Sequence, residues 1–386
     1  MSIVSYELKD ICKIRSGKRL PKGTDFSDTA TDYKYIRARD IKAGKIAKSE
    51  LVYITEEVYN KLSRYIVNAN DIVITIVGAS VGDVAYVTSE FDGINLTENA
   101  VRLTDFDDCV NSKYLMYILN SQKYWDLMQQ IAGGSAQPKL GIYKIESIVV
   151  NLPKREIQDK IVSVLSTYDD LIENNQKQIQ LLEEAAQRLY KEWFVDLRFP
   201  GHATTHIIDG IPEDWTKGTI GDVAFFKRGK TITKDKTCNG SIPVVAGGLE
   251  PAYYHNQSNT SSPVITVSGS GANAGFTRLY NTDIWASDCS YVDSQETKNI
   301  FFTYCSLKDK KSDMDALKKG AAQPHVYAKD INALPIIVPD RDVLDKFEYR
   351  VSSCFGKIKI LQRQIELAVQ ARDRLLPKLM SGELEV

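Results

Sequence analysis

Apolar side chains recur at alternating steps of three and four in two long stretches of the chain. One stretch runs from Ile161 to Trp193, and the other runs from Phe347 to Leu379, 186 residues later. Sustained heptads of this kind predict two long helices that pair as a coiled coil. Each helix would have about 35 residues and a length of about 50 Å. An ordinary core helix in a bundle is the alternative interpretation of each stretch.

The two seams share one register, and each contains a polar residue, Asn175 in the first and Arg372 in the second. A single polar seam position can fix the register of paired helices at some cost in stability. The predicted seam residues are Ile161, Leu165, Tyr168, Ile172, Asn175, Ile179, Leu182, Leu189, Phe347, Val351, Ile358, Leu361, Ile365, Leu375 and Leu379.

The rest of the chain has mostly strand patterns. β-branched runs closed by glycine at 71–78 and 262–269 predict strands, and 112–119 is the clearest short helical pattern. Prolines at 153 and 339 directly precede the heptad stretches, where a strand can end and a helix can begin. The fold class is therefore α+β, with two strand-rich globular units and two long helices.

The two globular units repeat each other at their ends. The segment 8–22 matches 220–234, including a Gly-Lys step followed by a closing lysine, and Gly-Ser-Ala-Gln-Pro at 134–138 matches Gly-Ala-Ala-Gln-Pro at 320–324. The interiors differ, because the first copy spans 146 residues up to Pro153 and the second spans 120 residues up to Pro339. We infer a duplicated scaffold that carries two different inserts.

Charge and cysteine content narrow the class of protein. The 386 residues include 49 basic and 50 acidic side chains, which excludes a bulk polycation but leaves a local excess of 12 basic over 7 acidic residues within 1–50. The six cysteines form no CxxC pair, which favours a reducing cytoplasm and argues against structural zinc. We expect a cytoplasmic protein with no signal peptide and no membrane span, because no apolar run is long enough.

Motifs for catalysis are incomplete. The glycine-rich stretch 268–275 has Ala274 at a position where a dinucleotide fingerprint needs glycine, and a strand pattern follows it, so it predicts a strand turn. Gly229-Lys230-Thr231 lacks the earlier glycine of a P-loop, because Ala224 stands there. The four histidines form no HExxH motif. We therefore predict no catalytic residues, no metal ligands and no cofactor in this chain.

Basic residues at matched places of the two copies predict a nucleic-acid surface. Lys and Arg beside a glycine turn can contact phosphates, and Arg can read guanine, while a glutamine amide can read adenine or hold a phosphate. Arg37 and Arg39 are expected to alternate on one strand, so that both point the same way. A solvated charged face, or loop capping by glutamine, is the alternative for each residue. The predicted DNA-binding residues are Arg15, Lys18, Arg19, Lys22, Arg37, Arg39, Gln137, Lys227, Arg228, Lys230, Lys234 and Gln323.

The whole chain resembles the specificity subunits of type I restriction–modification systems, through the two-fold repeat, the Ala-Gln-Pro loops, and helix ends at 187–201 and 374–384. The resemblance implies that two target recognition domains, 1–153 and 201–339, each read one half of a bipartite, asymmetric DNA target. It implies that conserved helical spacers, 154–200 and 340–386, pack as an antiparallel coiled coil and set the length of the unread DNA between the half-sites.

The resemblance also implies partners besides double-stranded DNA. Two methyltransferase subunits would bind the helices and supply S-adenosylmethionine and adenine methylation. Two restriction and translocase subunits would supply ATP- and Mg²⁺-dependent translocation and cleavage, leaving this chain non-catalytic. The chain departs from its relatives before each helix, where 152–158 and 338–342 lack their frequent Pro-Pro and Glu-Gln. Two other classes remain open, a nucleotide-dependent enzyme that uses the glycine-rich turn and a scaffold whose domains read peptides.

Overall fold

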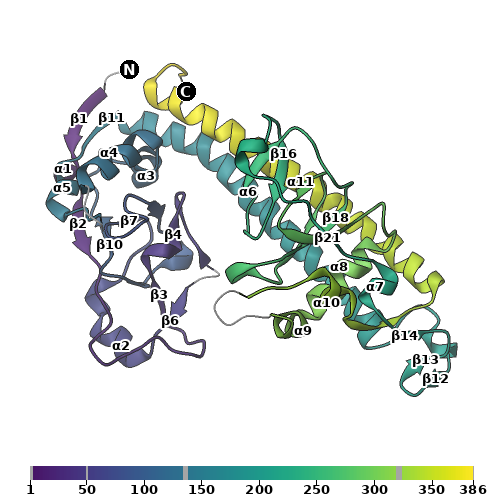
Figure 1. Cartoon of the computed structure of the whole chain (residues 1–386). Coiled ribbons are helices and arrows are strands. Elements are labelled where there is room, and N and C mark those ends of the chain that lie inside the picture. The colour runs from purple at the N-terminus through teal and green to yellow at the C-terminus, as the bar shows by residue number, and fades with distance from the viewer. Residues whose placement is uncertain (1–2, 49–50, 134–137, 319–323, 386) are drawn as a thin grey trace. The chain divides into compact units, whose positions relative to one another are not determined.

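The computed structural model describes residues 3–48, 51–133, 138–318 and 324–385 (Figure 1). The chain forms two compact units, the first from Met1–Leu171 with Ala368–Val386 and the second from Ile172–Leu367. Two long helices, α6 (Arg155–Tyr190) and α11 (Arg341–Ser381), contribute residues to both units. This division follows spatial contacts, whereas the four segments named from the sequence follow the repeat and remain a prediction.

The first unit is built on an antiparallel four-stranded sheet in the order β2-β10-β7-β8. A separate antiparallel pair joins β1 to β11, and a small sheet has the order β6-β3-β9. The elements of this unit before α6 are β1 (Ile3–Glu7), α1 (Leu8–Ile11), β2 (Lys13–Ser16), β3 (Lys34–Ile36), η1 (Ala38–Asp40), β4 (Ile41–Lys42), β5 (Lys45–Ile46), β6 (Val52–Tyr53), α2 (Glu56–Lys61), η3 (Ser63–Tyr65), β7 (Ile72–Thr75), β8 (Val84–Tyr86), η4 (Ser89–Phe91), β9 (Asn95–Leu96), β10 (Ala100–Thr104), α3 (Ser112–Leu119), α4 (Gln122–Ala132), α5 (Ile142–Glu146) and β11 (Val149–Pro153).

The second unit repeats this topology. Its four-stranded sheet has the order β15-β21-β18-β19, β14 pairs with β22, and β17-β16-β20 form the small sheet. The elements between α6 and α11 are η5 (Lys191–Val195), η6 (His202–Thr204), β12 (Ile207–Ile208), β13 (Ile211–Pro212), β14 (Thr216–Thr219), α7 (Ile220–Val223), β15 (Lys227–Arg228), η7 (Lys234–Lys236), β16 (Ile242–Val245), β17 (Tyr253–His255), β18 (Val264–Ser268), η8 (Gly271–Asn273), β19 (Thr277–Tyr280), β20 (Trp285–Ala286), β21 (Cys289–Asp293), α8 (Ile300–Asp309), α9 (Lys311–Ala316), α10 (Ala328–Asn332) and β22 (Pro335–Val338).

The matched sheets confirm that the repeat in the sequence is a repeat of the fold, and the class is α+β as predicted. The predicted strands at 71–78 and 262–269 contain β7 and β18, and the predicted helix at 112–119 has the bounds of α3. Within the described part of the chain, no helix is both long enough and apolar enough to cross a membrane.

The two long helices are longer than the heptad pattern alone indicates. Helix α6 has 36 residues, and the five residues of η5 continue it as a π-helical turn. Helix α11 has 41 residues and begins six residues before the first seam position, Phe347. Helix α11 begins this early because Asp340 caps it. The carboxylate of Asp340 accepts hydrogen bonds from the backbone N–H groups of Asp342 and Val343, at 2.8 and 3.2 Å.

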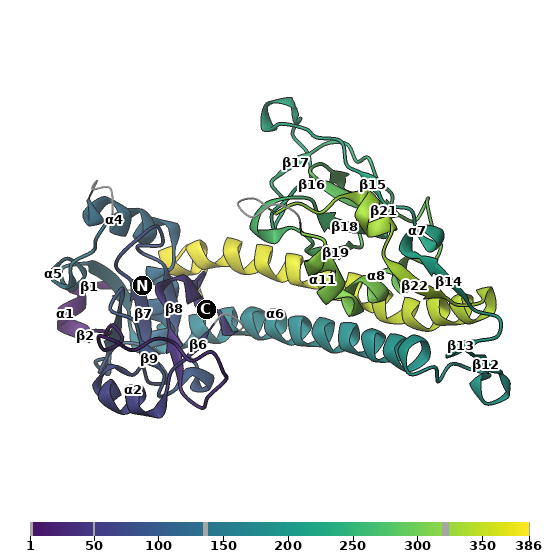
Figure 2. The ribbon, with the colours of Figure 1, turned by 60° about the horizontal axis from the view of Figure 1, so that its bottom comes forward.

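The helices pack antiparallel within each unit (Figures 1 and 2). In the second unit, Asn175 Nδ2 lies 3.2 Å from Gln364 Oε1, whereas Tyr190, later on α6, contacts Phe347, earlier on α11. In the first unit, Ile161 and Leu379 belong to one apolar cluster. All of the predicted seam residues are buried or partly buried.

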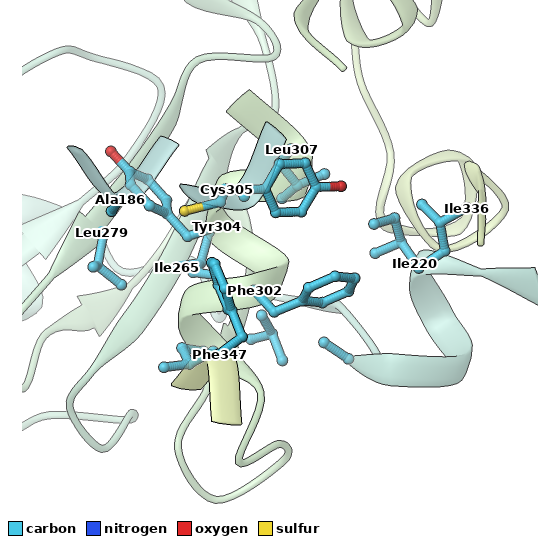
Figure 3. Close-up of a cluster of buried hydrophobic side chains, with 14 of the residues drawn as sticks. Ala186, Ile220, Ile265, Leu279, Phe302, Tyr304, Cys305, Leu307, Ile336 and Phe347 are labelled. Atoms are coloured by element: carbon cyan, nitrogen blue, oxygen red, sulfur yellow. The ribbon is translucent and has the colours of Figure 1, made fainter. Parts of the chain in front are cut away.

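The core of the second unit is rich in aromatic rings from α6, α8 and α11. Figure 3 shows Phe302 and Cys305 of α8 beside Phe347 of α11. Phe194 lies in contact with both phenylalanines, with ring centroids 4.9 Å from Phe302 and 5.0 Å from Phe347. Edge-to-face rings at these distances stabilise a core beyond the area they bury. The globular part of this unit is therefore attached to the helices through a continuous apolar core.

Candidate nucleic-acid interface

A Gly-Lys turn follows the edge strand β2 in the first unit, and the backbone of this turn forms hydrogen bonds with three other residues. The N–H of Gly17 donates to the carbonyl of Ala100 at 3.0 Å, and the N–H of Lys18 donates to the carbonyl of Leu96 at 2.8 Å. The hydroxyl of Tyr35 donates to the carbonyl of Lys18 at 2.7 Å. A Cβ atom on Gly17 would lie 2.5 Å from the carbonyl oxygen of Leu96, so only glycine fits there.

The equivalent turn follows β15 in the second unit and makes the same backbone contacts. The N–H groups of Gly229 and Lys230 donate to the carbonyls of Cys289 and Ala286, at 2.8 and 2.9 Å. The indole N–H of Trp285 donates to the carbonyl of Lys230 at 2.7 Å. A Cβ atom on Gly229 would lie 2.7 Å from the carbonyl oxygen of Ala286. Each unit therefore presents one lysine from a turn of fixed conformation.

The two lysine side chains are exposed and lie over aromatic rings. The ammonium of Lys18 is 5.8 Å from the ring centroid of Tyr65, and that of Lys230 is 6.0 Å from the ring of Trp285. Neither lysine forms an ion pair with any described residue. A cation–π contact holds the ammonium in place without neutralising its charge. Both lysines are thus placed to bind an anion.

Other predicted residues of the two turns have carboxylate partners. Arg19 Nε lies 2.7 Å from Glu98 Oε1, and Lys227 forms an ion pair with Glu296. These pairs are exposed, and exposed pairs contribute only about 0–1 kcal/mol. The arginine and the lysine can therefore exchange their carboxylates for phosphates at small cost.

Arg37 and Arg39 do not lie on one strand, so the predicted placement is wrong. Strand β3 ends at Ile36, and Ala38–Asp40 form a short 3₁₀ helix that Asp40 stabilises. The Asp40 carboxylate is fully buried and accepts from the backbone N–H of Arg37 at 2.8 Å and from its guanidinium Nη2 at 2.9 Å. Arg37 is consequently partly buried, whereas Arg39 is exposed. A role for either in DNA binding remains a prediction.

The other predicted basic residues are exposed. Arg15 lies on β2 opposite Arg102 of β10, Lys22 follows the first Gly-Lys turn, and Lys234 begins the 3₁₀ helix η7. Arg228 is also exposed, and its Nη2 is 3.9 Å from Asp288 Oδ1. These positions agree with a surface role and leave the DNA contact itself a prediction.

Gln137 and Gln323 lie outside the described residues, but the prolines that follow them are described. The carbonyl of Pro138 accepts a hydrogen bond from the N–H of Gly78 at 3.4 Å, and the carbonyl of Pro324 accepts one from the N–H of Gly271 at 3.1 Å. Pro138 and Pro324 are therefore each hydrogen-bonded to a glycine turn of their own unit, which comprises residues 78–82 between β7 and β8 in the first unit and 268–275 between β18 and β19 in the second.

The glycine-rich stretch of the second unit joins two antiparallel strands, β18 and β19. Gly271 and Gly275 have φ values of 77° and 83°, in the region that favours glycine. This geometry confirms a strand turn, since a dinucleotide fingerprint needs a helix after the strand. In the described ranges, no group of three or more His, Cys, Asp and Glu side chains is arranged to hold a metal.

Sequence reasoning missed Asp288, which connects the two turns of the second unit. Its carboxylate accepts from the hydroxyl of Ser270 in the glycine turn at 2.9 Å and pairs with Arg228 in the Gly-Lys turn. Asp288 is 60 residues from Arg228 along the chain, and no local pattern marks it. The Gly-Lys turn, the glycine turn and Pro324 are therefore neighbours in this unit.

Comparison with known proteins supports the resemblance. The family model for the type I restriction modification DNA specificity domain matches residues 3–184 and 212–362. A type I restriction enzyme MjaIX specificity subunit of Methanocaldococcus jannaschii is 29% identical over 304 residues, which cover 72% of this chain and 70% of the relative. A type I restriction enzyme HindI specificity subunit of Haemophilus influenzae is 21% identical over 404 residues, covering 82% of this chain and 87% of the relative.

The fold agrees with a solved structure over almost the whole chain. The crystal structure of a type I restriction–modification system S subunit from M. genitalium superposes with a TM-score of 0.60, covering 98% of this chain and 96% of that one at 17% identity. The two matched regions coincide with the two repeated halves described above. The chain therefore belongs to the type I restriction modification DNA specificity family, as a specificity subunit with two target recognition domains.

Proposed function

We propose that this chain recognises a bipartite, asymmetric DNA target for a type I restriction–modification enzyme. Each recognition domain reads one half of the target, and the paired helices set the spacer between the halves. The observation that carries this proposal is the pair of Gly-Lys turns, which present Lys18 and Lys230 from equivalent backbones with no carboxylate partner among the described residues. Lysines in such positions suit phosphate contacts that orient a domain on DNA.

The surroundings of the two turns differ, which supports two different half-sites. Lys18 has a tyrosine ring beside it, whereas Lys230 has an indole. The first copy also contains more residues between its matched ends than the second copy. Base readout depends on side chains at the groove, so unlike surfaces on one frame suit an asymmetric target.

The partners of the proposed enzyme are double-stranded DNA, two methyltransferase subunits and two restriction and translocase subunits. In this proposal the partners hold S-adenosylmethionine, ATP and Mg²⁺, and this chain is a non-catalytic, cytoplasmic subunit. Exposed apolar side chains on the long helices support a docking role. They include Leu181 of α6, which is 63% exposed, and Ile360 and Leu367 of α11, which are 54% and 49% exposed.

Domain exchange tests the proposal. Residues 1–153 are replaced by the recognition domain of another specificity subunit, the chimera is expressed with its methyltransferase subunits, and methylated adenines are mapped across the genome. We expect one half-site to change while the other is kept, and a chimera with 201–339 replaced should show the reverse. Methylation of the original target by both chimeras would contradict the proposal.

Single substitutions test the lysines. We expect Lys18→Ala and Lys230→Ala each to reduce the slope of log affinity against log salt by about 0.9, the value for one phosphate contact. Lys217→Ala is the matched control, since Lys217 is exposed on β14, which pairs with β22 in a different sheet from β15. A slope equal to that of the control would remove the tested lysine from the DNA contacts.

A further inference from the structure

A hollow with a volume of about 280 Å³ opens in the second unit between the glycine turn and helices α8 and α9. Its charged lining consists of three lysines, Lys308, Lys311 and Lys318, and one carboxylate, Asp315. Asp315 pairs with Lys318, whose Nζ lies 2.7 Å from Asp315 Oδ1. The charged residues of the lining therefore sum to a net charge of +2. We call this hollow the lysine pocket.

Small residues and a short helix create the lysine pocket. Ala272, Ala274 and Gly275 form its wall on the side of the glycine turn. Helix α9 opposite has only 6 residues and contributes Lys311 to the lining. These three positions carry no large side chain and leave space above the turn, and Phe276 borders the hollow beside them.

At the corresponding place in the first unit, side chains of α4 lie beside the glycine turn. Helix α4, which follows α3 as α9 follows α8, has 11 residues. A Cβ atom on Gly82 of the glycine turn would lie 3.3 Å from Met128 Cβ and 3.7 Å from a ring carbon of Trp125. The amide of Gln129 also hydrogen-bonds to the carbonyl of Val81 in that turn. The lysines of the pocket therefore stand where the first unit has Trp125, Met128 and Gln129 of α4 beside its turn.

Two of the pocket lysines form no ion pair with a described carboxylate, although Lys311 interacts electrostatically with Asp315 and Lys308 with Glu183. Lys311 forms no ion pair with a described residue, and Lys308 lies over the ring of Tyr304 at 5.9 Å. Both side chains are exposed. The glycine turn forms one wall of the pocket. Ser270 of this turn donates a hydrogen bond to Asp288, which also pairs with Arg228 of the Gly-Lys turn. The lysine pocket thus continues the basic surface proposed to meet DNA.

We propose that the lysine pocket binds a phosphate of the DNA backbone beside the half-site read by the second recognition domain. This inference rests on the proposed function and deepens it by adding Lys308 and Lys311, which the sequence patterns did not indicate. A phosphodiester carries one negative charge, and two ammonium groups at the mouth of a small hollow neutralise it. Contacts of this kind fix the position of a domain on the duplex without reading bases.

The test uses the complex of this chain with its methyltransferase subunits and a duplex that contains the mapped target. We expect Lys308→Ala/Lys311→Ala to reduce the slope of log affinity against log salt by about 0.9, the value for the one phosphate that the pocket is proposed to bind. The methylated sequence should stay the same. Lys308→Arg/Lys311→Arg should keep the slope of the unmodified chain, and Lys217→Ala serves as the neutral control.

A second measurement locates the contact. Single phosphates around the second half-site are replaced in turn by neutral methylphosphonates, and one of them should weaken binding by the unmodified chain but not by Lys308→Ala/Lys311→Ala. An alanine variant that keeps both its thermal unfolding midpoint and the full salt slope would overturn the proposal that the lysine pocket binds a phosphate. Failure of the unmodified complex to bind its target would instead overturn the proposed function, so the two failures are distinguishable.

Discussion

Gly17 and Gly229 are the single residues on which the two basic turns depend most directly. A side chain at Gly17 would meet the carbonyl oxygen of Thr97 at 2.1 Å, and one at Gly229 would meet that of Ser287 at 2.4 Å. The obstructing atoms are backbone atoms of a neighbouring loop, so they cannot rotate away as a flexible side chain could. The matched Gly-Lys steps in the sequence thus have one steric cause.

We expect Gly229→Ala to destabilise the second unit by about 1–3 kcal/mol, because the added methyl group overpacks the turn. Urea denaturation of the purified chain measures the loss. Gly356→Ala is the control, since no atom lies within 4 Å of a Cβ built on this helical glycine. The control should gain about 0.5–1 kcal/mol from the higher helix propensity of alanine. Equal stability of the two variants would contradict the steric argument.

Glu348 is a partly buried carboxylate on α11 that caps the start of α8. It accepts hydrogen bonds from the backbone N–H groups of Phe302 at 2.7 Å and Phe301 at 3.4 Å. Desolvation raises the pKa of Glu348 from 4.5 to about 7, although the two backbone N–H groups act in the opposite direction. The folded state therefore holds this proton at a pH where the unfolded chain has released it.

Because its pKa is higher in the folded state, Glu348 makes stability fall as the pH rises from about 4.5 to about 7. We expect Glu348→Gln to remove this part of the pH dependence and to raise the free energy of unfolding at pH 8 by about 1–3 kcal/mol. The amide oxygen of glutamine can still accept the bond from Phe302. Urea midpoints measured at pH 5 and pH 8 test this, and an unchanged difference between them would refute it.

Helices α6 and α11 have different side chains at equivalent positions in the two units. In the first unit, Asp169 of α6 accepts from Arg372 of α11 at 2.8 Å and from the hydroxyl of Tyr117 in α3. The helix repeat relates Asp169 to Phe355 and Arg372 to Ala186, both fully buried in the second unit. The same helix pair therefore accommodates an ion pair at this position in the first unit and apolar side chains at the equivalent position in the second. The ion pair is thus not required for the two helices to pack together.

We expect Arg372→Met to destabilise the first unit by about 2–4 kcal/mol, because Asp169 would lose its cation in a partly buried place. Adding Asp169→Leu should recover at least half of this loss, since the pair would then resemble the apolar contact of the second unit. A double-mutant cycle of unfolding free energies measures the coupling. A double variant less stable than Arg372→Met would show that the pair itself is indispensable.

Sequence patterns predicted the elements whose signals are local. The heptads marked the helices, and the repeated segments marked the equivalent Gly-Lys turns. The strand expected through Arg37 and Arg39 failed because the side chain of Asp40 caps a 3₁₀ turn that hydrophobic alternation cannot show. The ion pairs of Arg19 and Lys227 were also beyond reach, because their carboxylates lie 79 and 69 residues away in the sequence.

At the scale of the whole chain, residues from both ends belong to one unit. The apolar core of the first unit contains Leu8 near the N-terminus and Leu379 near the C-terminus. We expect Leu379→Ala to cost about 2–5 kcal/mol, as other buried leucine truncations do. Amide hydrogen exchange should become faster in β1 and β11, while β18 of the second unit keeps its protection.

Leu384→Ala is the control for this prediction, because Leu384 also lies near the C-terminus but is 42% exposed. The control should leave the exchange rates of both units unchanged. Equal acceleration in β11 and β18 after Leu379→Ala would show that the two units open together and would contradict the division of the core.

The sharing of α6 between the units has a consequence for genetic exchange between related specificity subunits. Ile161 and Leu165 of α6 belong to the apolar core of the first unit. A crossover at Pro153 separates the strands of this unit from these two residues, so the strands from one subunit must pack on the helix of another. A crossover near Leu171 transfers strands and helix together. Viable recombinants should therefore have their junctions inside the helix more often than at its start, and the yield of folded chimeras made with each junction measures the difference.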